Sequence, residues 1–404
     1  MIRLRALLVA AMALIAMPAL ADTPLPPRTA NGLALTPPMG WNSWNKFGCD
    51  IDEAKVRGVA ETMASNGMRD AGYSYVVIDD CWQGKRDDHG DIQPDPKRFP
   101  SGIKALADFV HSKGLKFGIY SDAGTMTCAK RPGSQGHEYQ DAAQYARWGV
   151  DYLKYDWCYT GTRYAEEAYT TMADALAATG RPIILSICEW GTAKPWLWAR
   201  NIGNLWRTTG DISDLWEGKR DYTLGVTNIL DLQADLHPYS GPGHWNDPDM
   251  LEVGNGGMAD DEYRAHFAMW AMLAAPLIAG NDVRGMDAQT RAILLAPEII
   301  AIDQDPLGRQ ARRVWKDGTS EIWARDLADG SRAVALLNRG TAPAEIAIDW
   351  ARIGYPSRLA ATVRDLWARK DLGRRTASYA TSVRPHAAVI VRIVPVTGQR
   401  GGSE

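Results

Sequence analysis

Residues 138–156 read EYQDAAQYARWGVDYLKYD, in which an amphipathic helical pattern runs directly into a short, mostly apolar strand pattern. A second helical pattern follows at 164–180, and this alternation is typical of βα units and a parallel sheet. The same alternation starts near residue 36 and continues through the first three quarters of the chain. The expected strands lie within residues 39–44, 73–80, 115–122, 150–156, 181–190, 203–211, 243–251 and 275–280. Eight strands are the number that closes a (β/α)8, or TIM, barrel.

The character of the chain changes after residues 302–308. No helical pattern follows, and short alternating strands with turns between them predict a small C-terminal antiparallel β-sandwich. The expected strands lie within residues 321–327, 332–340, 344–350, 360–368 and 387–394. At the other end, Arg3 and Arg5 precede an apolar run that closes with Ala-Leu-Ala, which indicates a secretory signal peptide. We therefore expect a secreted or periplasmic protein, not held in a membrane once the signal is removed. Its expected parts are a signal peptide (1–21), the barrel (22–307), the sandwich (308–398) and a flexible tail (399–404).

The bulk composition argues against a nucleic-acid partner. The chain has 45 basic and 48 acidic residues, a formal net charge of −3, so it lacks the excess positive charge that a polyanion partner requires. Tryptophan is abundant, with 16 copies against 5 phenylalanines, and indole rings stack well on the apolar faces of sugars. The five cysteines allow at most two intrachain disulfides, and none has the C-x-x-C spacing of a zinc or redox site.

Polar side chains end six consecutive expected strands, from the second to the seventh. Barrel enzymes place their sites at these carboxyl ends, so the recurrence points to one shared site. A single aspartate there is more often a turn residue or a helix cap. The residues are Asp79, Asp80, Tyr120, Asp122, Lys154, Asp156, Cys188, Glu189, Arg207, Asp211, Asp247 and Asp249.

The fourth strand carries a cation two residues before an acid, inside an apolar run. Strand alternation turns Lys154, Asp156 and Cys158 to one side, toward the barrel mouth. A charge left unpaired there would cost several kcal/mol. Lys154 favours the ionised form of Asp156, which makes Asp156 a candidate nucleophile. A buried ion pair with a purely structural role would give the same sequence pattern. Asp211, in a loop beyond its strand, is the candidate general acid.

A carboxylate pair surrounded by further acids, Tyr, Arg and Trp suits a neutral, polyhydroxylated substrate. Carboxylates accept hydrogen bonds from hydroxyl groups, and indole covers the apolar face of a sugar ring. A phosphorylated substrate would call for glycine-rich loops or several cations at the strand ends, and neither is found there. The residues therefore predict glycoside hydrolysis by two carboxyl groups.

Seven motifs closely resemble those of the α-galactosidase (melibiase) family of retaining glycoside hydrolases. The resemblance runs from about residue 31 to the end of the chain, and it implies a (β/α)8 barrel with a C-terminal β-sandwich and no cofactor or metal. The motifs are TPPMGWNSWN, IDDCW, FPSGIKALADFVHSKGLKFGIYSDAG, WGVDYLKYD, CEWG, WRTTGDI and GHWNDPDMLEVGNGGM.

The resemblance also implies roles for individual residues. Asp156 would be the nucleophile that forms a covalent galactosyl intermediate, and Asp211 would be the acid that then serves as base. Asp79 and Asp80 would hold the 4- and 6-hydroxyls, which requires the second strand to bend at its end. Lys154 would reach the 3-hydroxyl. The remaining implied pocket residues are Glu189, Cys188 and Arg207 around the 2-position, and Trp44, Tyr120, Trp190, Asp249 and Met250.

The family pattern implies two disulfides, Cys49 with Cys81 and Cys128 with Cys158, which leaves Cys188 free. On that reading the thiol of Cys158 is structural and fixes the loop that follows Asp156. A disulfide of this kind typically contributes a few kcal/mol.

Four other interpretations remain open at this point. An α-N-acetylgalactosaminidase would need a small residue where Glu189 stands, and a β-L-arabinopyranosidase would have a longer acid in place of Asp80. A galactose-binding protein without catalysis would not need both Asp156 and Asp211. A metal-dependent hydrolase would have to use His244 and Asp247, which lack the usual clustered spacing.

Overall fold

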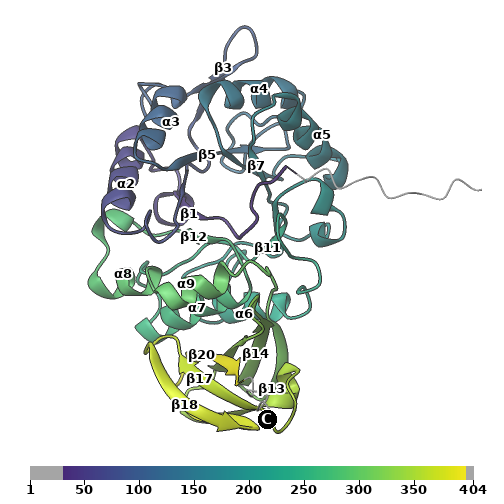
Figure 1. Ribbon diagram of the computed structural model, residues 1–404. Helices are drawn as coiled ribbons and strands as arrows, with labels where there is room; N and C mark the ends of the chain where they lie inside the picture. Colours follow the sequence, from purple (N-terminus) through teal and green to yellow (C-terminus); the bar gives the residue numbers. More distant parts are fainter. Residues whose placement is uncertain (1–30, 397–404) are drawn as a thin grey trace, which may run out of the picture.

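The computed structural model describes residues 31–396 (Figure 1). The expected signal peptide and C-terminal tail lie outside the described residues. All eight expected barrel strands form, and most are a few residues shorter than the stretches that predicted them. They are β1 (Met39–Asn42), β2 (Tyr75–Val77), β5 (Lys116–Asp122), β6 (Tyr152–Asp156), β7 (Ile184–Ile187), β8 (Leu205–Arg207), β11 (Trp245–Asp247) and β12 (Leu277–Ala279).

The eight strands form one sheet in the order β11-β8-β7-β6-β5-β2-β1-β12, and every neighbouring pair is parallel. Leu251, just beyond β11, closes the ring through a parallel bridge to Ala279 in β12. Its N–H donates to the carbonyl of Ile278 at 2.8 Å, and its own carbonyl accepts from Gly280 at 2.9 Å. The predicted (β/α)8 barrel is thereby confirmed.

Helices surround the sheet, and their ends follow the sequence. Asp52 caps the first long helix by accepting from the N–H of Lys55, and Gly149 ends another with a left-handed φ of 83°. Between β7 and β8 the chain makes only two short 3-10 turns. The barrel helices are α2 (Glu53–Ser65), α3 (Ile103–Ser112), α4 (Glu138–Trp148), α5 (Ala165–Ala178), α6 (Val226–Gln233), α7 (Asp260–Met272), α8 (Ala288–Leu294) and α9 (Pro297–Asp303).

Alternation along β6 separates the barrel interior from its outer layer. Tyr152 belongs to a cluster inside the barrel, whereas Leu153 and Tyr155 belong to the large cluster under the helices. Lys154 and Asp156 therefore share the interior side with Tyr152, at the end of the strand where barrel sites lie.

The C-terminal part is a sandwich of a six-stranded and a two-stranded antiparallel sheet, as predicted. Five strands correspond to the expected stretches: β14 (Ser320–Asp326), β15 (Arg332–Asn338), β16 (Ala344–Asp349), β17 (Ala360–Asp365) and β20 (Ala387–Pro395). Three were not expected: β13 (Arg312–Asp317), β18 (Lys370–Thr376) and β19 (Ser378–Val383). Strands β16 and β19 form the smaller sheet.

Helix α7 joins the two parts. It is buried on nearly all sides from Tyr263 onward. One apolar cluster contains Phe267 of α7 together with Trp323 and Ile390 of the six-stranded sheet. Nη1 of the buried Arg325 donates to the carbonyl of Ala271, at the end of α7, at 2.7 Å. The sandwich thus packs directly on the barrel, below it in Figure 1.

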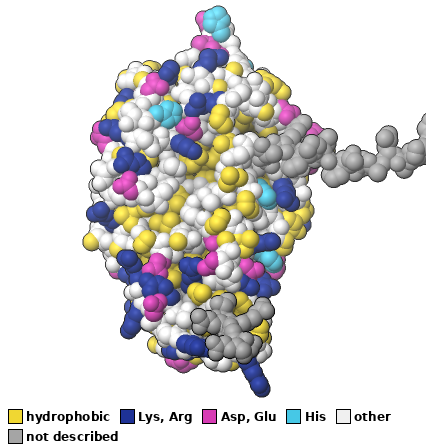
Figure 2. Space-filling view, in the orientation of Figure 1, with side chains coloured by type: hydrophobic (Ala, Val, Ile, Leu, Met, Phe, Trp, Pro, Cys, Tyr) yellow, Lys and Arg dark blue, Asp and Glu magenta, His cyan; other side chains and the backbone are white. Residues whose placement is uncertain are grey.

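Within residues 31–396 no helix combines the length and the apolar character needed to cross a bilayer. Figure 2 shows basic and acidic side chains interspersed over the face it draws, without a large field of one sign. This distribution agrees with the nearly balanced charge of the sequence, and the face drawn offers no basic track for a polyanion.

Candidate active site

A cavity of about 500 Å³ opens at the carboxyl ends of the barrel strands. Eight of the expected site residues line it, together with four other residues. The eight are Trp44, Asp79, Asp80, Tyr120, Lys154, Asp156, Trp190 and Asp211, and the four are Cys128, Cys158, Gly210 and Tyr222.

Asp79 and Asp80 both reach this cavity because β2 ends before them, at Val77. The backbone turns sharply after the pair, where Cys81 has a left-handed φ of 77°. Asp79 Oδ2 accepts hydrogen bonds from Lys154 Nζ at 2.8 Å and from Asn42 Nδ2 at 2.7 Å. Regular strand alternation, which would have separated the two acids, therefore does not apply to them.

The direct partner of Lys154 is Asp79, whereas the sequence suggested Asp156. Asp156 Oδ2 instead accepts from the hydroxyl of Tyr120 at 2.9 Å, and Oδ1 accepts from the N–H of Trp157 at 2.9 Å. Lys154 still acts on Asp156 through its charge. Burial raises the pKa of Asp156 to about 6, the charge of Lys154 opposes this rise, and the charge of Asp211 adds to it. Asp156 is therefore a carboxylate at neutral pH.

Asp211 lies four residues beyond Arg207, the last residue of β8, and its side chain keeps 29% of its surface exposed. Arg207 itself is only 3% exposed, and its Nη2 contacts Asp211 Oδ1 at 2.9 Å and Asp249 Oδ2 at 3.0 Å. Asp249 Oδ2 also accepts from the N–H of Ile212 at 2.8 Å. Arg207 and Asp249 thus hold the Asp211 loop from behind the cavity.

Five residues that the family pattern places at the substrate do not line the cavity: Cys188, Glu189, Arg207, Asp249 and Met250. Glu189 is completely buried, and its Oε2 accepts from Thr192 Oγ1 at 2.7 Å and from the N–H of Ala193 at 2.5 Å. Its carboxylate therefore folds back onto its own loop. The motif identifies a glutamate at this strand end but contains no information on the direction of its side chain.

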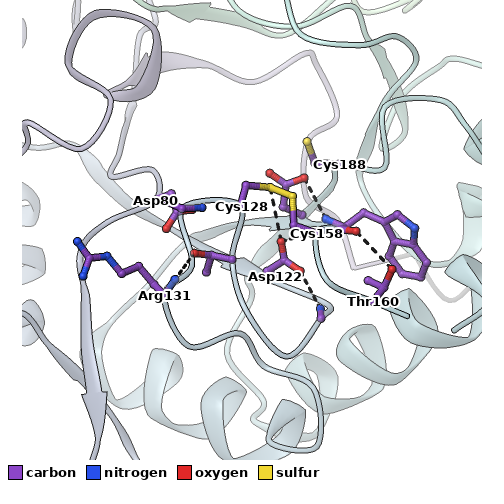
Figure 3. Close-up of a disulfide and its surroundings, with 12 residues drawn as sticks. Asp80, Asp122, Cys128, Arg131, Cys158, Thr160 and Cys188 are labelled. Carbon is purple, nitrogen blue, oxygen red and sulfur yellow. Dashed lines mark hydrogen bonds between the residues drawn. A yellow bond between two sulfur atoms is a disulfide. The ribbon is translucent and has the colours of Figure 1, made fainter. Parts of the chain in front are cut away.

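Both implied disulfides form, Cys49 with Cys81 and Cys128 with Cys158, and Cys188 is free and buried, so that prediction is confirmed. The second disulfide forms part of the cavity wall, and Asp122, which does not line the cavity, lies next to it (Figure 3). Asp122 accepts from the N–H groups of Gly124 and Cys158. Burial, together with the charge of Asp156, raises the pKa of Asp122 to about 8.

Among the described residues, one group of His, Cys, Asp and Glu side chains is close enough to share a metal ion, namely Asp122 with Cys128 and Cys158. Both sulfurs are already joined in the disulfide, so they offer no thiolate ligand. His244 does not join Asp247 in such a group and stacks instead on Trp206, at 6.1 Å between ring centroids.

Comparison with known proteins gives two family matches that together span both parts of the fold. Residues 36–305 match the model described as alpha galactosidase A, and residues 317–393 match the alpha galactosidase C-terminal beta sandwich domain. The chain belongs to the α-galactosidase family. It is therefore a glycoside hydrolase, as the sequence predicted.

Individual members of the α-galactosidase family are similar over most of the chain. Alpha-galactosidase A of Cellvibrio japonicus is 56% identical over 322 residues, which cover 79% of this chain and 80% of the relative. The crystal structure of α-galactosidase I from Mortierella vinacea is 40% identical, with a TM-score of 0.88 over 90% of this chain and 98% of the other. An α-galactosidase from Saccharomyces cerevisiae, solved with raffinose, is 32% identical, with a TM-score of 0.88 over 92% and 100%.

Sequence reasoning missed Tyr222, although this residue lines the cavity of this α-galactosidase-family chain. It lies in the turn between two very short strands, β9 (Lys219–Arg220) and β10 (Thr223–Leu224), and is 75% exposed. A single tyrosine in a polar loop matches no motif, so nothing in the sequence pattern pointed to it.

Buried carboxyl groups are expected to make this family member more stable in mild acid than in mild alkali. Burial raises the pKa of Asp122 to about 8, of Glu252 to about 7 and of Asp247 to about 6. Each group binds its proton more tightly in the native than in the unfolded state, so stability falls as pH rises through these values. We expect Tm to increase when the pH is lowered from 8 to 6.5, measured by calorimetry at constant ionic strength. Below pH 6.5 the buried His266 opposes the trend, because burial lowers its pKa to about 3.

The stability prediction has an internal control. Asp122→Asn removes the group with the highest of these three pKa values and should flatten the pH dependence of Tm between pH 6 and 8. A Tm that falls when the pH is lowered from 8 to 6.5 would contradict the prediction.

Proposed function

We propose that the protein is an exported α-galactosidase that hydrolyses terminal, non-reducing α-D-galactosyl groups with retention of configuration. The observation that carries the proposal is the presence of Asp156 and Asp211 on one cavity, with Lys154, Asp79 and Asp80 around them. The names of the relatives support the choice of galactosides.

In this proposal Asp156 attacks the anomeric carbon while Asp211 protonates the departing oxygen. Asp211 then deprotonates the water that releases galactose from Asp156. The hydrogen bonds from Tyr120 and from the N–H of Trp157 orient the two oxygens of Asp156. Retention requires the two carboxyl groups to stand about 5–5.5 Å apart, whereas an inverting pair stands roughly 6.5–9.5 Å apart.

The other polar side chains that line the cavity suit the hydroxyl groups of galactose. Asp79 and Lys154 form a buried ion pair with exposed fractions of 2% and 14%, and both side chains line the cavity. They can accept from and donate to neighbouring hydroxyls, while Trp44 and Trp190 offer indole surfaces. Asp80 is shorter than the acid of the arabinopyranosidase branch and so leaves room for the hydroxymethyl group of galactose.

Three chromogenic substrates assayed side by side test the proposal. The p-nitrophenyl derivatives of α-galactose, α-N-acetylgalactosamine and β-L-arabinopyranose separate the three activities considered for this family. Proton NMR of the first-formed sugar then gives the stereochemistry. Failure to turn over the α-galactoside would remove the proposed activity, and β-galactose as the first product would remove retention.

The acid limb of the pH profile follows from Asp156. Because its pKa is about 6, the nucleophile becomes protonated below that pH. At pH values well below 6, kcat/KM should therefore fall tenfold for each further pH unit. The Tyr120 hydrogen bond lowers this pKa, so Tyr120→Phe should move the limb to higher pH, by about 0.5–1 unit.

Tyr73→Phe is the matched control for the pH experiment, since Tyr73 is equally buried but donates its hydroxyl to the carbonyl of Leu294. Its acid limb should coincide with that of the wild type. A shift of the Tyr120→Phe limb to lower pH would contradict the role given to this hydrogen bond.

Export is supported by the signal pattern at residues 1–21 and by the two disulfides, which persist in oxidising compartments. Expression of the full chain in a host with a secretion system, followed by N-terminal sequencing of the recovered protein, tests this part. A mature chain that begins at Asp22 is expected, and an uncleaved cytoplasmic chain would exclude export.

A further inference from the structure

A second groove adjoins the catalytic cavity on the side of Asp211. It measures about 650 Å³ and shares Trp44, Asp211 and Tyr222 with the cavity. The groove is lined by residues that include Trp44, Asn45, Asp211, Asp214, Tyr222 and Asn255. Its volume falls within the range of small-molecule sites, about 300–1,000 Å³.

The hairpin that carries Tyr222 is attached to the backbone of Asp211 itself. The N–H of Leu224 donates to the carbonyl of Asp211 at 2.8 Å, and the N–H of Ser213 donates to the carbonyl of Leu224 at 2.9 Å. Tyr222 is two residues before Leu224, so its position is fixed relative to the proposed acid. Tyr222 as a whole is nevertheless 75% exposed, so aromatic surface remains open to solvent.

Part of the groove lining is polar and held in place by hydrogen bonds. The side-chain amides of Asn45 and Asn255 each donate to a different oxygen of Glu252, which is only 4% exposed. Three aromatic side chains, Trp44, Phe47 and Tyr222, line the same groove. Carboxylates such as Asp214 and Asp221, which can accept hydrogen bonds from hydroxyl groups, together with aromatic faces that cover C–H surfaces, make up a site suited to a sugar ring.

The chemistry of glycoside cleavage decides what this groove receives. The general acid must reach the oxygen that joins the galactosyl unit to its leaving group, so the leaving group departs on the side of that acid. With Asp211 as the acid, the leaving group lies against Asp211 and Tyr222. Carboxyl groups outnumber cations along the groove, namely Asp211, Asp214, Asp221 and Glu252 against Lys46 and Arg220, which disfavours an anionic sugar.

We infer that this groove binds the saccharide released by the enzyme, and that Tyr222 gives preference to galactosides of neutral oligosaccharides over those with small leaving groups. The inference rests on the proposed function and adds to it the substrate class and a residue that determines specificity. Tyr222 would act by stacking on the sugar next to the galactosyl unit.

The test compares a substrate that fills the groove with one that does not. Raffinose places a sugar there, whereas α-galactosyl fluoride releases only fluoride. Tyr222→Ala should reduce kcat/KM for raffinose about tenfold more than for α-galactosyl fluoride, the effect expected from loss of one aromatic stacking contact. Tyr222→Phe keeps the ring and should retain the wild-type ratio.

Tyr164→Ala is the matched control, because Tyr164 is 74% exposed and precedes α5, outside the residues that line the cavity and the groove. It should leave both rates unchanged. A second readout is the transfer of galactose from α-galactosyl fluoride to added sucrose, which should decrease relative to hydrolysis in Tyr222→Ala.

The outcomes separate the two proposals. If the wild type releases no galactose from either substrate, the proposed function fails. If it hydrolyses both, but Tyr222→Ala lowers the two rates by the same factor or changes neither, the function stands and the inference is wrong.

Discussion

Asp156→Asn is expected to lower kcat on α-galactosyl fluoride by about 10⁴-fold or more, because a neutral amide cannot form the covalent intermediate. The exchange preserves the size of the side chain, so the fold and the affinity for galactose should persist. Burial raises the pKa of Asp156, which means that its ionised form is disfavoured in the native state. At pH 8 the variant should therefore have a Tm at least equal to that of the wild type.

Two further measurements distinguish a nucleophile from any other essential acid. Asp156→Ala assayed with azide should yield β-galactosyl azide, because the small anion attacks the open face of the α-linked substrate directly. Asp303→Asn is the matched control, a buried carboxyl in α9 outside the cavity lining, and should retain activity. Activity of Asp156→Asn within tenfold of the wild type would overturn the assignment.

Asp211→Ala is expected to reduce kcat/KM for raffinose by about 10²–10⁴-fold, the usual contribution of general acid catalysis. The loss should be much smaller for α-galactosyl fluoride, since fluoride departs without a proton. The released Arg207 keeps its contact with Asp249 Oδ2 at 3.0 Å, so the strand end should hold its position.

The anomer of galactosyl azide that the variant forms also identifies the role of Asp211. In Asp211→Ala, azide should intercept the intermediate on Asp156 and yield α-galactosyl azide, the opposite anomer from that expected for Asp156→Ala. Thermal unfolding monitors the integrity of the variant. Equal losses of kcat/KM on raffinose and on α-galactosyl fluoride would show that Asp211 is not the acid.

The barrel was predictable because its strands are short and buried on both faces. Such strands appear in sequence as apolar runs between amphipathic helices, as residues 150–156 do between α4 and α5. Strand β18 was not predictable for the opposite reason. Six of its seven residues are exposed and only Leu372 is partly buried, so it has no alternation of apolar and polar side chains to detect.

The candidate site was predictable at the level of strands but not of contacts. Alternation correctly placed Lys154 and Asp156 on the same side of β6, because it depends only on local geometry. The carboxylate that pairs with Lys154 is Asp79, which follows β2, two strands away in the sheet. A single sequence does not reveal which side chains of different strands pair with one another, because this depends on how the barrel closes.

Loops account for the remaining differences between sequence and structure. Glu189 turns into its own loop through Thr192 and Ala193, and Tyr222 reaches the cavity only because its hairpin pairs with the segment after Asp211. Both arrangements depend on backbone turns, such as the left-handed φ of 58° at Trp190 and 55° at Asp221. Tryptophan rarely adopts such a conformation, and aspartate, although enriched in it, adopts it only in a minority of cases, so the sequence does not identify either turn.

The way α7 is buried limits how this enzyme can be shortened or recombined. Phe267 shares an apolar cluster with Trp323 and Ile390. A catalytic unit that ended near residue 307 would therefore expose a large hydrophobic surface to water and should aggregate. Grafting a sandwich from a relative would require matching the facing side chains of the helix as well. The sandwich is therefore part of the folding unit that contains the barrel, and the two parts should not be separable without loss of stability.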